Sequence, residues 1–183
     1  MTEVYLKNMV CPRCIMAVER LLQDEHITYK NVKLGSILWD ELPSSTQMEK
    51  LIVGLQQLGF EFLEDKNSQI IEKVKVFLIN LIQNKSLSES FVLSDEVSKH
   101  LNKEYSTISK LFSQVESITL EHYFINLKIS KAKELLKYDE MSVSEIAFEL
   151  GYKNVSHLSS QFKKEVGLSP VAFRLNYQRT KER

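Results

Sequence analysis

The sequence predicts an α+β protein in which a small domain of strands and helices precedes an all-helical domain. Before residue 66 the apolar residues form short alternating runs, and after residue 67 they recur at helical spacing. The charge also divides: residues 1–70 carry seven basic and ten acidic side chains, and residues 71–183 carry 17 and 14. Both cysteines and the single tryptophan lie in the first part. We therefore expect two domains, residues 1–66 and 67–183.

The elements of the first domain are expected in the order β-α-β-β-α-β. Gly35 supplies the turn between the two middle strands, and Gly59 ends the second helix as a left-handed cap. This is the split β-α-β order of a ferredoxin-like sandwich. The expected strands are 3–9, 27–34, 36–40 and 60–63, and the expected helices are 14–23 and one that follows 43–45 and reaches 58.

The second domain is expected to be helical throughout. Ser94 and the two acidic residues after it predict the cap of a short helix, and Ser142 with Glu145 predicts a capping box. Asn102 and Gly151 then supply turns. The expected helices are 68–83, a short one from 94 to 101, 105–115, a long one at 120–138, a short one after 142, and 154–166.

A short helix, a turn and a second helix occur twice in this domain. Asn102 and Gly151 occupy equivalent turn positions, and the long helix lies between the two units. A helix-turn-helix needs a small residue where its helices pack, which Ser98 and Ala147 supply. It also needs a second helix with one apolar and one polar face. Both units meet these requirements.

Two segments of the helical domain resemble AraC/XylS-family transcription regulators of bacteria. SVSEIAFELGYKNVSHLSSQFKKEVGLSPVAFR, from Ser142 to Arg174, resembles the family signature, and residues 129–136 resemble its linker helix. The resemblance covers residues from about 70 to 176. It implies two helix-turn-helix subdomains joined by the long linker helix. Their recognition helices would enter successive major grooves of double-stranded DNA, roughly 34 Å apart. A homodimer is among the partners that the sequence allows.

The resemblance also assigns candidate DNA-binding residues by their positions. Lys110 suits O6 and N7 of guanine, and serine and threonine hydroxyls suit several base edges. Lys103, Asn154 and Lys164, with the helix N-termini, are better placed for phosphate. The candidates are Ser106, Thr107, Ser109, Lys110 and Ser113 on the first recognition helix, and Asn154, Ser156, His157, Ser159, Ser160 and Lys163 on the second.

A second motif, Cys11-Pro-Arg-Cys14, falls where the first strand gives way to the first helix. Two thiols at this spacing can converge on one ion, and a helix N-terminus favours their thiolate forms. Soft thiolates select Cu(I) or Zn. Met9-x-Cys11-x-x-Cys14 resembles the metal site of heavy-metal-associated domains of the copper-chaperone type, over residues 2 to about 65. The resemblance implies that Cys11 and Cys14 hold the metal in a sensing or dimerisation domain. Met9 is expected to pack beneath the loop.

Several interpretations of the cysteine pair stay open. Cu(I) could be held by the two thiolates alone, whereas Zn prefers four ligands and would need a second subunit or His26. Cys-Pro-Arg-Cys is also similar to the glutaredoxin motif, in which Cys11 would attack and Cys14 would resolve. The protein would then be a thiol-redox-responsive regulator or a thiol oxidoreductase. A metal chaperone carrying a helical partner-binding domain and two inert packing cysteines complete the alternatives.

The remaining composition favours a cytoplasmic regulator over an enzyme. No general base, cofactor loop or Ser/His/Asp cluster stands out, and no apolar run approaches the roughly 20 residues of a membrane span. The formal net charge of zero divides into −3 before residue 70 and +3 after it. Such a small basic surplus predicts weak non-specific DNA binding with a shallow salt dependence. The sequence thus predicts a DNA-binding transcription regulator whose CxxC domain senses a thiophilic metal ion.

Overall fold

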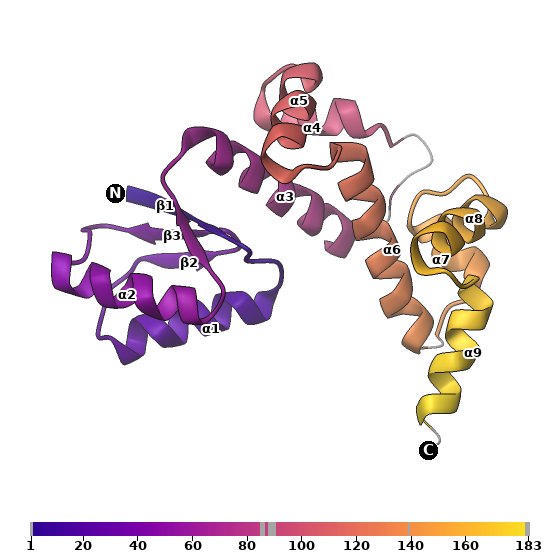
Figure 1. Ribbon diagram of the computed structural model, residues 1–183, viewed down its shortest axis with the longest axis horizontal. Coiled ribbons are helices and arrows are strands. Elements are labelled where there is room, and N and C mark those ends of the chain that lie inside the picture. Colours follow the sequence, from indigo (N-terminus) through magenta and orange to yellow (C-terminus); the bar gives the residue numbers. More distant parts are fainter. Residues whose placement is uncertain (1, 85–86, 88–90, 139, 182–183) are drawn as a thin grey trace. The chain divides into compact units, whose positions relative to one another are not determined.

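The computed structural model describes residues 2–84, 87, 91–138 and 140–181 (Figure 1). The chain divides into two compact units, Met1–Phe77 and Leu78–Arg183. The division falls inside one continuous helix, α3 (Lys66–Asn84), whereas the sequence places the domain boundary at the start of that helix. Within the described part of the chain, no helix combines the length and apolarity that crossing a membrane requires.

The first unit contains a four-stranded antiparallel sheet with the strand order β2-β3-β1-β4. β1 lies in the centre, where Val4 pairs with Ile37 of β3 and Leu6 pairs with Phe62 of β4. The elements follow one another as β-α-β-β-α-β. Their bounds are β1 (Thr2–Lys7), α1 (Pro12–Asp24), β2 (Asn31–Lys33), β3 (Ser36–Trp39), α2 (Ser45–Gln57) and β4 (Glu61–Leu63).

The two faces of this sheet are covered differently. α1 and α2 cover one face (Figure 1), and the side chains buried between them and the strands are hydrophobic. On the other face, the Nζ of Lys73 in α3 lies 4.5 Å from the centre of the Tyr5 ring. The start of α3 also lies close to the turn between β2 and β3: a Cβ on Gly35 would stand 2.8 Å from Cγ2 of Val76. The core residues shared by α1, α2 and the sheet are Leu6, Val18, Leu22, Ile37, Trp39, Leu51 and Leu55.

β2 is shorter than the strand predicted at 27–34, because the residues before it form the end of α1. His26 has a left-handed φ of 52°. The N–H of Ile27 donates to the carbonyl of Leu22 at 2.8 Å, and the N–H of His26 donates to Gln23 at 3.0 Å. These two bonds make a Schellman motif, in which Ile27 packs against Leu22. The prediction was therefore wrong for residues 27–30.

The second unit is helical, and most of its elements agree with the prediction. α6 has the predicted bounds, and Ser142 with Glu145 forms the predicted capping box at the start of α7. Ser94 is not a helix cap, because α4 begins at Leu93, before it, and Val92 provides no side-chain cap. The bounds are α4 (Leu93–Leu101), α5 (Tyr105–Glu116), α6 (Leu120–Tyr138), α7 (Val143–Glu149), α8 (Val155–Val166) and α9 (Pro170–Lys181).

Candidate nucleic-acid interface and thiol site

The first helix-turn-helix consists of α4 and α5. Asn102 ends α4 with a left-handed φ of 51°, a conformation that asparagine tolerates, so the turn forms without glycine. Val97, Ile108 and Phe112 form the buried contact of the two helices. The opposite face of α5 is therefore turned outward.

α5 exposes most of the residues that the sequence assigned to DNA. Ser106, Thr107 and Lys110 are exposed. Ser109 and Ser113 are half-buried, and the Ser113 hydroxyl donates to the Ser109 carbonyl at 3.0 Å. A direct base contact by Ser113 would have to compete with this bond. Lys110 thus supplies the one exposed cation among the five residues named on this helix.

Tyr105, which the sequence analysis did not single out, fixes the start of α5. Its hydroxyl donates to Oε1 of Glu121 on α6 at 2.5 Å. This hydrogen bond lowers the pKa of Glu121, while burial raises the pKa of Tyr105 well above its usual range. α5 is therefore attached to α6 by a hydrogen bond to a carboxylate.

The second helix-turn-helix consists of α7 and α8. Gly151 has a φ of 66°, and the N–H of Tyr152 donates to the carbonyl of Ala147 at 2.9 Å. Asn154 caps α8, because its side-chain oxygen accepts the N–H of His157 at 2.8 Å. The Asn154 side-chain oxygen is thus engaged, and its NH2 group is the part left for a phosphate. Asparagine is a preferred N-cap residue, so the sequence already offered Asn154 as the cap of this helix.

α8 exposes most of the residues that the sequence assigned to DNA on the second helix-turn-helix. Leu158 and Phe162 are fully buried on its inner face. Ser159, one of the assigned residues, is half-buried. The other assigned residues on or next to α8 are exposed: Asn154, Ser156, His157, Ser160 and Lys163.

α9 supports the second helix-turn-helix and was missed by the sequence analysis. Ser169 caps it by accepting the N–H of Ala172 at 3.2 Å, and Pro170 occupies its first position. The Arg174 side chain donates to the carbonyl of Met141 just before α7. The Phe173 ring meets Phe162 edge-on at 5.6 Å. The Ser-Pro pair was the available signal for this helix.

The cysteine pair lies at the N-terminus of α1, as the sequence predicts. Cys11 is the N-cap residue and Pro12 the first residue of the helix. The two Sγ atoms lie 3.6 Å apart, and both residues are partly exposed. Met9 is fully buried beneath the loop, as predicted. Asn8, with a left-handed φ of 72°, holds the loop by donating its amide to the carbonyl of Gly59 at 3.0 Å.

The Cys11 thiol has the more reactive environment. The backbone N–H of Cys14 lowers the pKa of Cys11, the Cys14 side chain and Arg13 act in the same direction, and burial opposes them. A lowered thiol pKa increases the thiolate fraction, which is both the nucleophilic and the metal-binding form.

Among the described residues, the cysteine pair does not belong to any group of three or more histidine, cysteine, aspartate or glutamate side chains that could hold a metal ion. His26 follows the far end of α1, whose 13 residues span roughly 20 Å. It cannot complete a site with Cys11 and Cys14 of the same chain, so that version of the zinc alternative is wrong.

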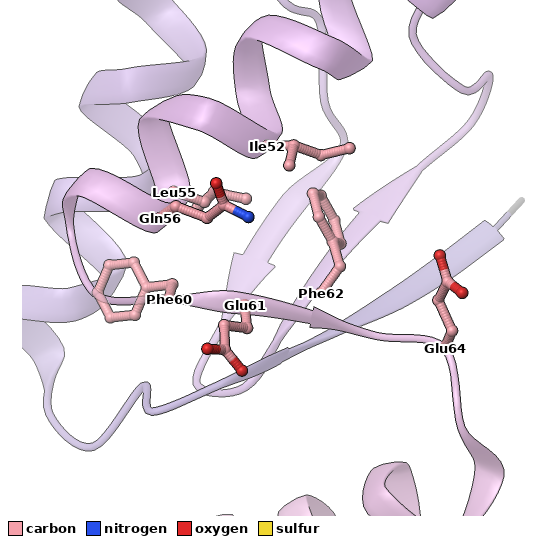
Figure 2. Close-up of a pocket in the computed structure, with 7 residues that line it drawn as sticks. All are labelled: Ile52, Leu55, Gln56, Phe60, Glu61, Phe62 and Glu64. Carbon is pink, nitrogen blue, oxygen red and sulfur yellow. The ribbon is translucent and has the colours of Figure 1, made fainter.

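The first unit also has a cavity of about 300 Å³ between α2 and the edge strand β4. Figure 2 shows Ile52 and Phe62 pointing toward one another across it, whereas Glu61 points away from α2. The lining of the cavity combines apolar side chains with the polar Gln56, Glu61 and Glu64. The sequence predicts no site at this place.

Comparison with known proteins assigns the helical part of the chain. A family model described as a helix-turn-helix domain matches residues 97–176. The Msm operon regulatory protein of Streptococcus mutans is 26% identical over 153 residues, which are 83% of this chain and 53% of that protein. The chain thus spans about half the length of this curated relative.

Two solved structures resemble the chain. The C-terminal domain of AraT, a response regulator from Geobacillus stearothermophilus, has a TM-score of 0.53 and 26% identity and covers 61% of this chain and 88% of its own. The DNA-binding domain of the global transcriptional factor AdpA, solved with a target DNA, has a TM-score of 0.51 and 20% identity. The match covers 66% of this chain and 99% of the AdpA chain. Residues 97–176 therefore form a helix-turn-helix domain with the fold of AraC-type DNA-binding domains.

Proposed function

We propose that this protein is a transcription regulator that binds double-stranded DNA through α5 and α8. The observation that carries the proposal is the repeated helix-turn-helix: each copy exposes the polar face of its second helix and buries the apolar face. The match of residues 97–176 to the helix-turn-helix model supports it, as does the likeness to a DNA-binding domain solved with its target.

Each recognition helix would enter a major groove with its N-terminal half. Lys110 would donate to a guanine, and the exposed hydroxyls of Ser106, Thr107 and Ser156 would contact base edges. Lys103 and the amide of Asn154 would contact phosphates and set the orientation of the helices. Recognition would then depend on a few placed side chains, because the basic surplus of this half is small.

Selection of duplexes from a random-sequence pool by the full chain tests the DNA-binding proposal. We expect enrichment of one sequence with two half-sites about one helical turn apart. A gel shift should then show tighter binding to the selected duplex than to a scrambled one. Recovery of no preferred sequence at low salt would contradict the proposal.

We propose further that Cys11 and Cys14 bind a thiophilic metal ion, Cu(I) or Zn, in a ferredoxin-like sensor domain. The strand order β2-β3-β1-β4 and the β-α-β-β-α-β succession support that domain type. Two thiolates that bind one ion tetrahedrally at about 2.3 Å stand roughly 3.8 Å apart. The observed separation of 3.6 Å is close to the value for a tetrahedral Zn ion. Zn would require further ligands from a second copy of the chain.

Replacing both cysteines with serine tests the metal proposal. Serine is a good N-cap, so the start of α1 should persist. We expect bound Cu(I) or Zn to fall from about one ion per site to none, and any metal-dependent change in DNA affinity to disappear. Metal content by mass spectrometry, followed by metal-titrated gel shifts, measures both effects.

Met16→Ser is the matched control for the cysteine variant. Met16 offers a sulfur on the same helix but is 67% exposed and points to no cluster of ligands. This variant should keep the metal and the response. Equal metal content in the wild type and the double serine variant would exclude the metal site.

A thiol redox switch is the second candidate function, and the lowered pKa of Cys11 favours it. The Cys11 thiolate would attack a small-molecule disulfide, which breaks the S–S bond, releases one thiol and leaves a mixed disulfide on Cys11. The Cys14 thiolate would then attack the Cys11 sulfur, which closes the Cys11–Cys14 disulfide and releases the second thiol. Thiol counting before and after oxidation, in metal-free protein, separates this candidate from metal binding. Reduction of insulin by the protein would indicate the oxidoreductase alternative.

A further inference from the structure

Lys128 of the long helix α6 lies among aromatic rings, and none of the DNA contacts proposed above involves it. Its Nζ lies 3.9 Å from the centre of the Tyr152 ring and 5.5 Å from that of Phe124. The Phe124 ring in turn stacks on Phe91 at 5.3 Å. A cation over an aromatic face is attracted by the negative face of the ring, and the attraction is stronger where water is excluded.

Tyr152 connects this lysine to the second recognition helix. It lies in the turn between α7 and α8 and is only 3% exposed. Its hydroxyl donates to Oε1 of Gln161 at 2.7 Å, and its ring meets His157 edge-on at 5.3 Å and 89°. Gln161 and His157 both belong to α8, so one ring contacts the linker helix on one side and the recognition helix on the other.

We propose that Lys128 is a positioning residue for DNA recognition, which holds Tyr152 against α6 and thereby fixes the orientation of α8. The inference rests on the proposed DNA-binding function and adds a determinant outside the DNA-facing surface. It applies to the second helix-turn-helix alone. At the equivalent turn position of the first, Lys103 is exposed and no such ring is present.

Two substitutions distinguish a role of the Lys128 charge from a role of its side-chain volume. Lys128→Met keeps a long unbranched side chain but removes the charge, and Lys128→Arg keeps the charge and can stack on the ring. If the charge matters, arginine should restore function and methionine should not. If only volume matters, both variants should resemble the wild type.

The titration of Lys128 provides a second distinction. Burial lowers the pKa of Lys128 to about 8, whereas burial and the nearby Glu165 raise the pKa of Tyr152. His157 on α8 contacts the Tyr152 ring, and His122 on α6 lies close to Glu165, with 3.9 Å between its Nε2 and Oε2 of the carboxylate. A change from about pH 7.5 to about pH 9.5 crosses the pKa of Lys128 and stays below the raised pKa of Tyr152. Loss of the Lys128 charge is therefore the main expected change within the cluster.

The experiment compares a duplex selected by the wild type with a scrambled duplex, at both pH values. We expect Lys128→Met to weaken binding of the selected duplex about 3- to 10-fold and to leave the scrambled duplex unchanged. Lys128→Arg should stay within about 2-fold of the wild type. The wild type should lose discrimination as the pH rises, whereas the arginine variant should keep it.

Lys137→Met is the matched control. Lys137 is also on α6 and lies over a tyrosine ring, 5.3 Å from Tyr177, but that ring belongs to α9. Its loss should leave the discrimination between duplexes unchanged. Full discrimination by Lys128→Met, together with an unchanged pH profile in the wild type, would overturn the proposal.

Two further readouts keep the inference testable. Thermal unfolding shows whether Lys128→Met folds. If it does not, the arginine variant and the wild-type pH profile decide whether discrimination between duplexes needs the charge at residue 128. If the wild type selects no duplex, the DNA-binding function fails separately. The proton resonances of the His157 ring, measured without DNA, then decide the positioning role. They should respond to the titration of Lys128 in the wild type, and an invariant signal would contradict the contact.

Discussion

Phe162→Ala is expected to destabilise the second helix-turn-helix by about 3–5 kcal/mol and to abolish specific DNA binding. The Phe162 side chain is fully buried between α8 and the linker helix and packs against Phe173 of α9. Its removal leaves a cavity where three helices meet. A loss of this size is a large share of the 5–15 kcal/mol that stabilises a typical domain. Amide hydrogen exchange along α7 and α8, with gel shifts on a selected duplex, measures both effects.

Phe148→Ala makes the same chemical change at a surface position and is the control for this prediction. The Phe148 side chain is 67% exposed on α7. We expect its loss to change stability by less than about 0.5 kcal/mol. Equal exchange protection in the two alanine variants would show that α8 does not depend on the buried ring.

Lys110→Ala is expected to relax sequence discrimination by about 1–3 kcal/mol, or roughly 5- to 150-fold, at one base pair of the first half-site. Lys110 is exposed on the outer face of α5, opposite the buried Ile108 and Phe112. Its ammonium can donate to both acceptors of a guanine edge. Gel shifts on the selected duplex and on its three single-base variants at each position would locate the effect.

Lys103→Ala separates base contacts from phosphate contacts. Lys103 lies in the turn before α5 and is equally exposed. We expect its loss to weaken all duplexes alike and to reduce the slope of log affinity against log salt by about one. If Lys110→Ala also weakened all duplexes alike, Lys110 would be a phosphate contact and not a base contact.

The helix ends show which local signals the sequence carries. Gly59 and Gly151 each end a helix with a left-handed φ, and both turns could be predicted because glycine adopts this conformation without strain. α1 ends in the same way at His26, with a φ of 52°. Histidine is a weaker signal for this conformation than glycine, so the sequence predicts a strand from residue 27 onward. The backbone conformation there depends on Ile27 packing with Leu22, which is a tertiary contact.

The candidate site likewise contains features that local sequence predicts and features that depend on tertiary contacts. The polar faces of α5 and α8 follow from helical periodicity, because burial of Ile108, Phe112, Leu158 and Phe162 turns the remaining residues outward. The contact of Lys128 with Tyr152 joins a helix to a turn 24 residues later in the chain, and no periodicity relates the two residues. The thiol pair, within one turn of α1, was predictable from spacing alone.

The continuity of α3 bears on how such a protein could be assembled by recombination of gene segments. Ile71 and Val74 are buried in the part of the helix that belongs to the first unit, and Leu78 and Ile82 in the part that belongs to the second. A crossover within the helix would leave each unit with only half of the buried apolar residues of α3, without the half that continues them. Exchange of the N-terminal unit for another domain should therefore succeed at junctions that keep residues 66–84 together, so the exchangeable segment does not coincide with either compact unit.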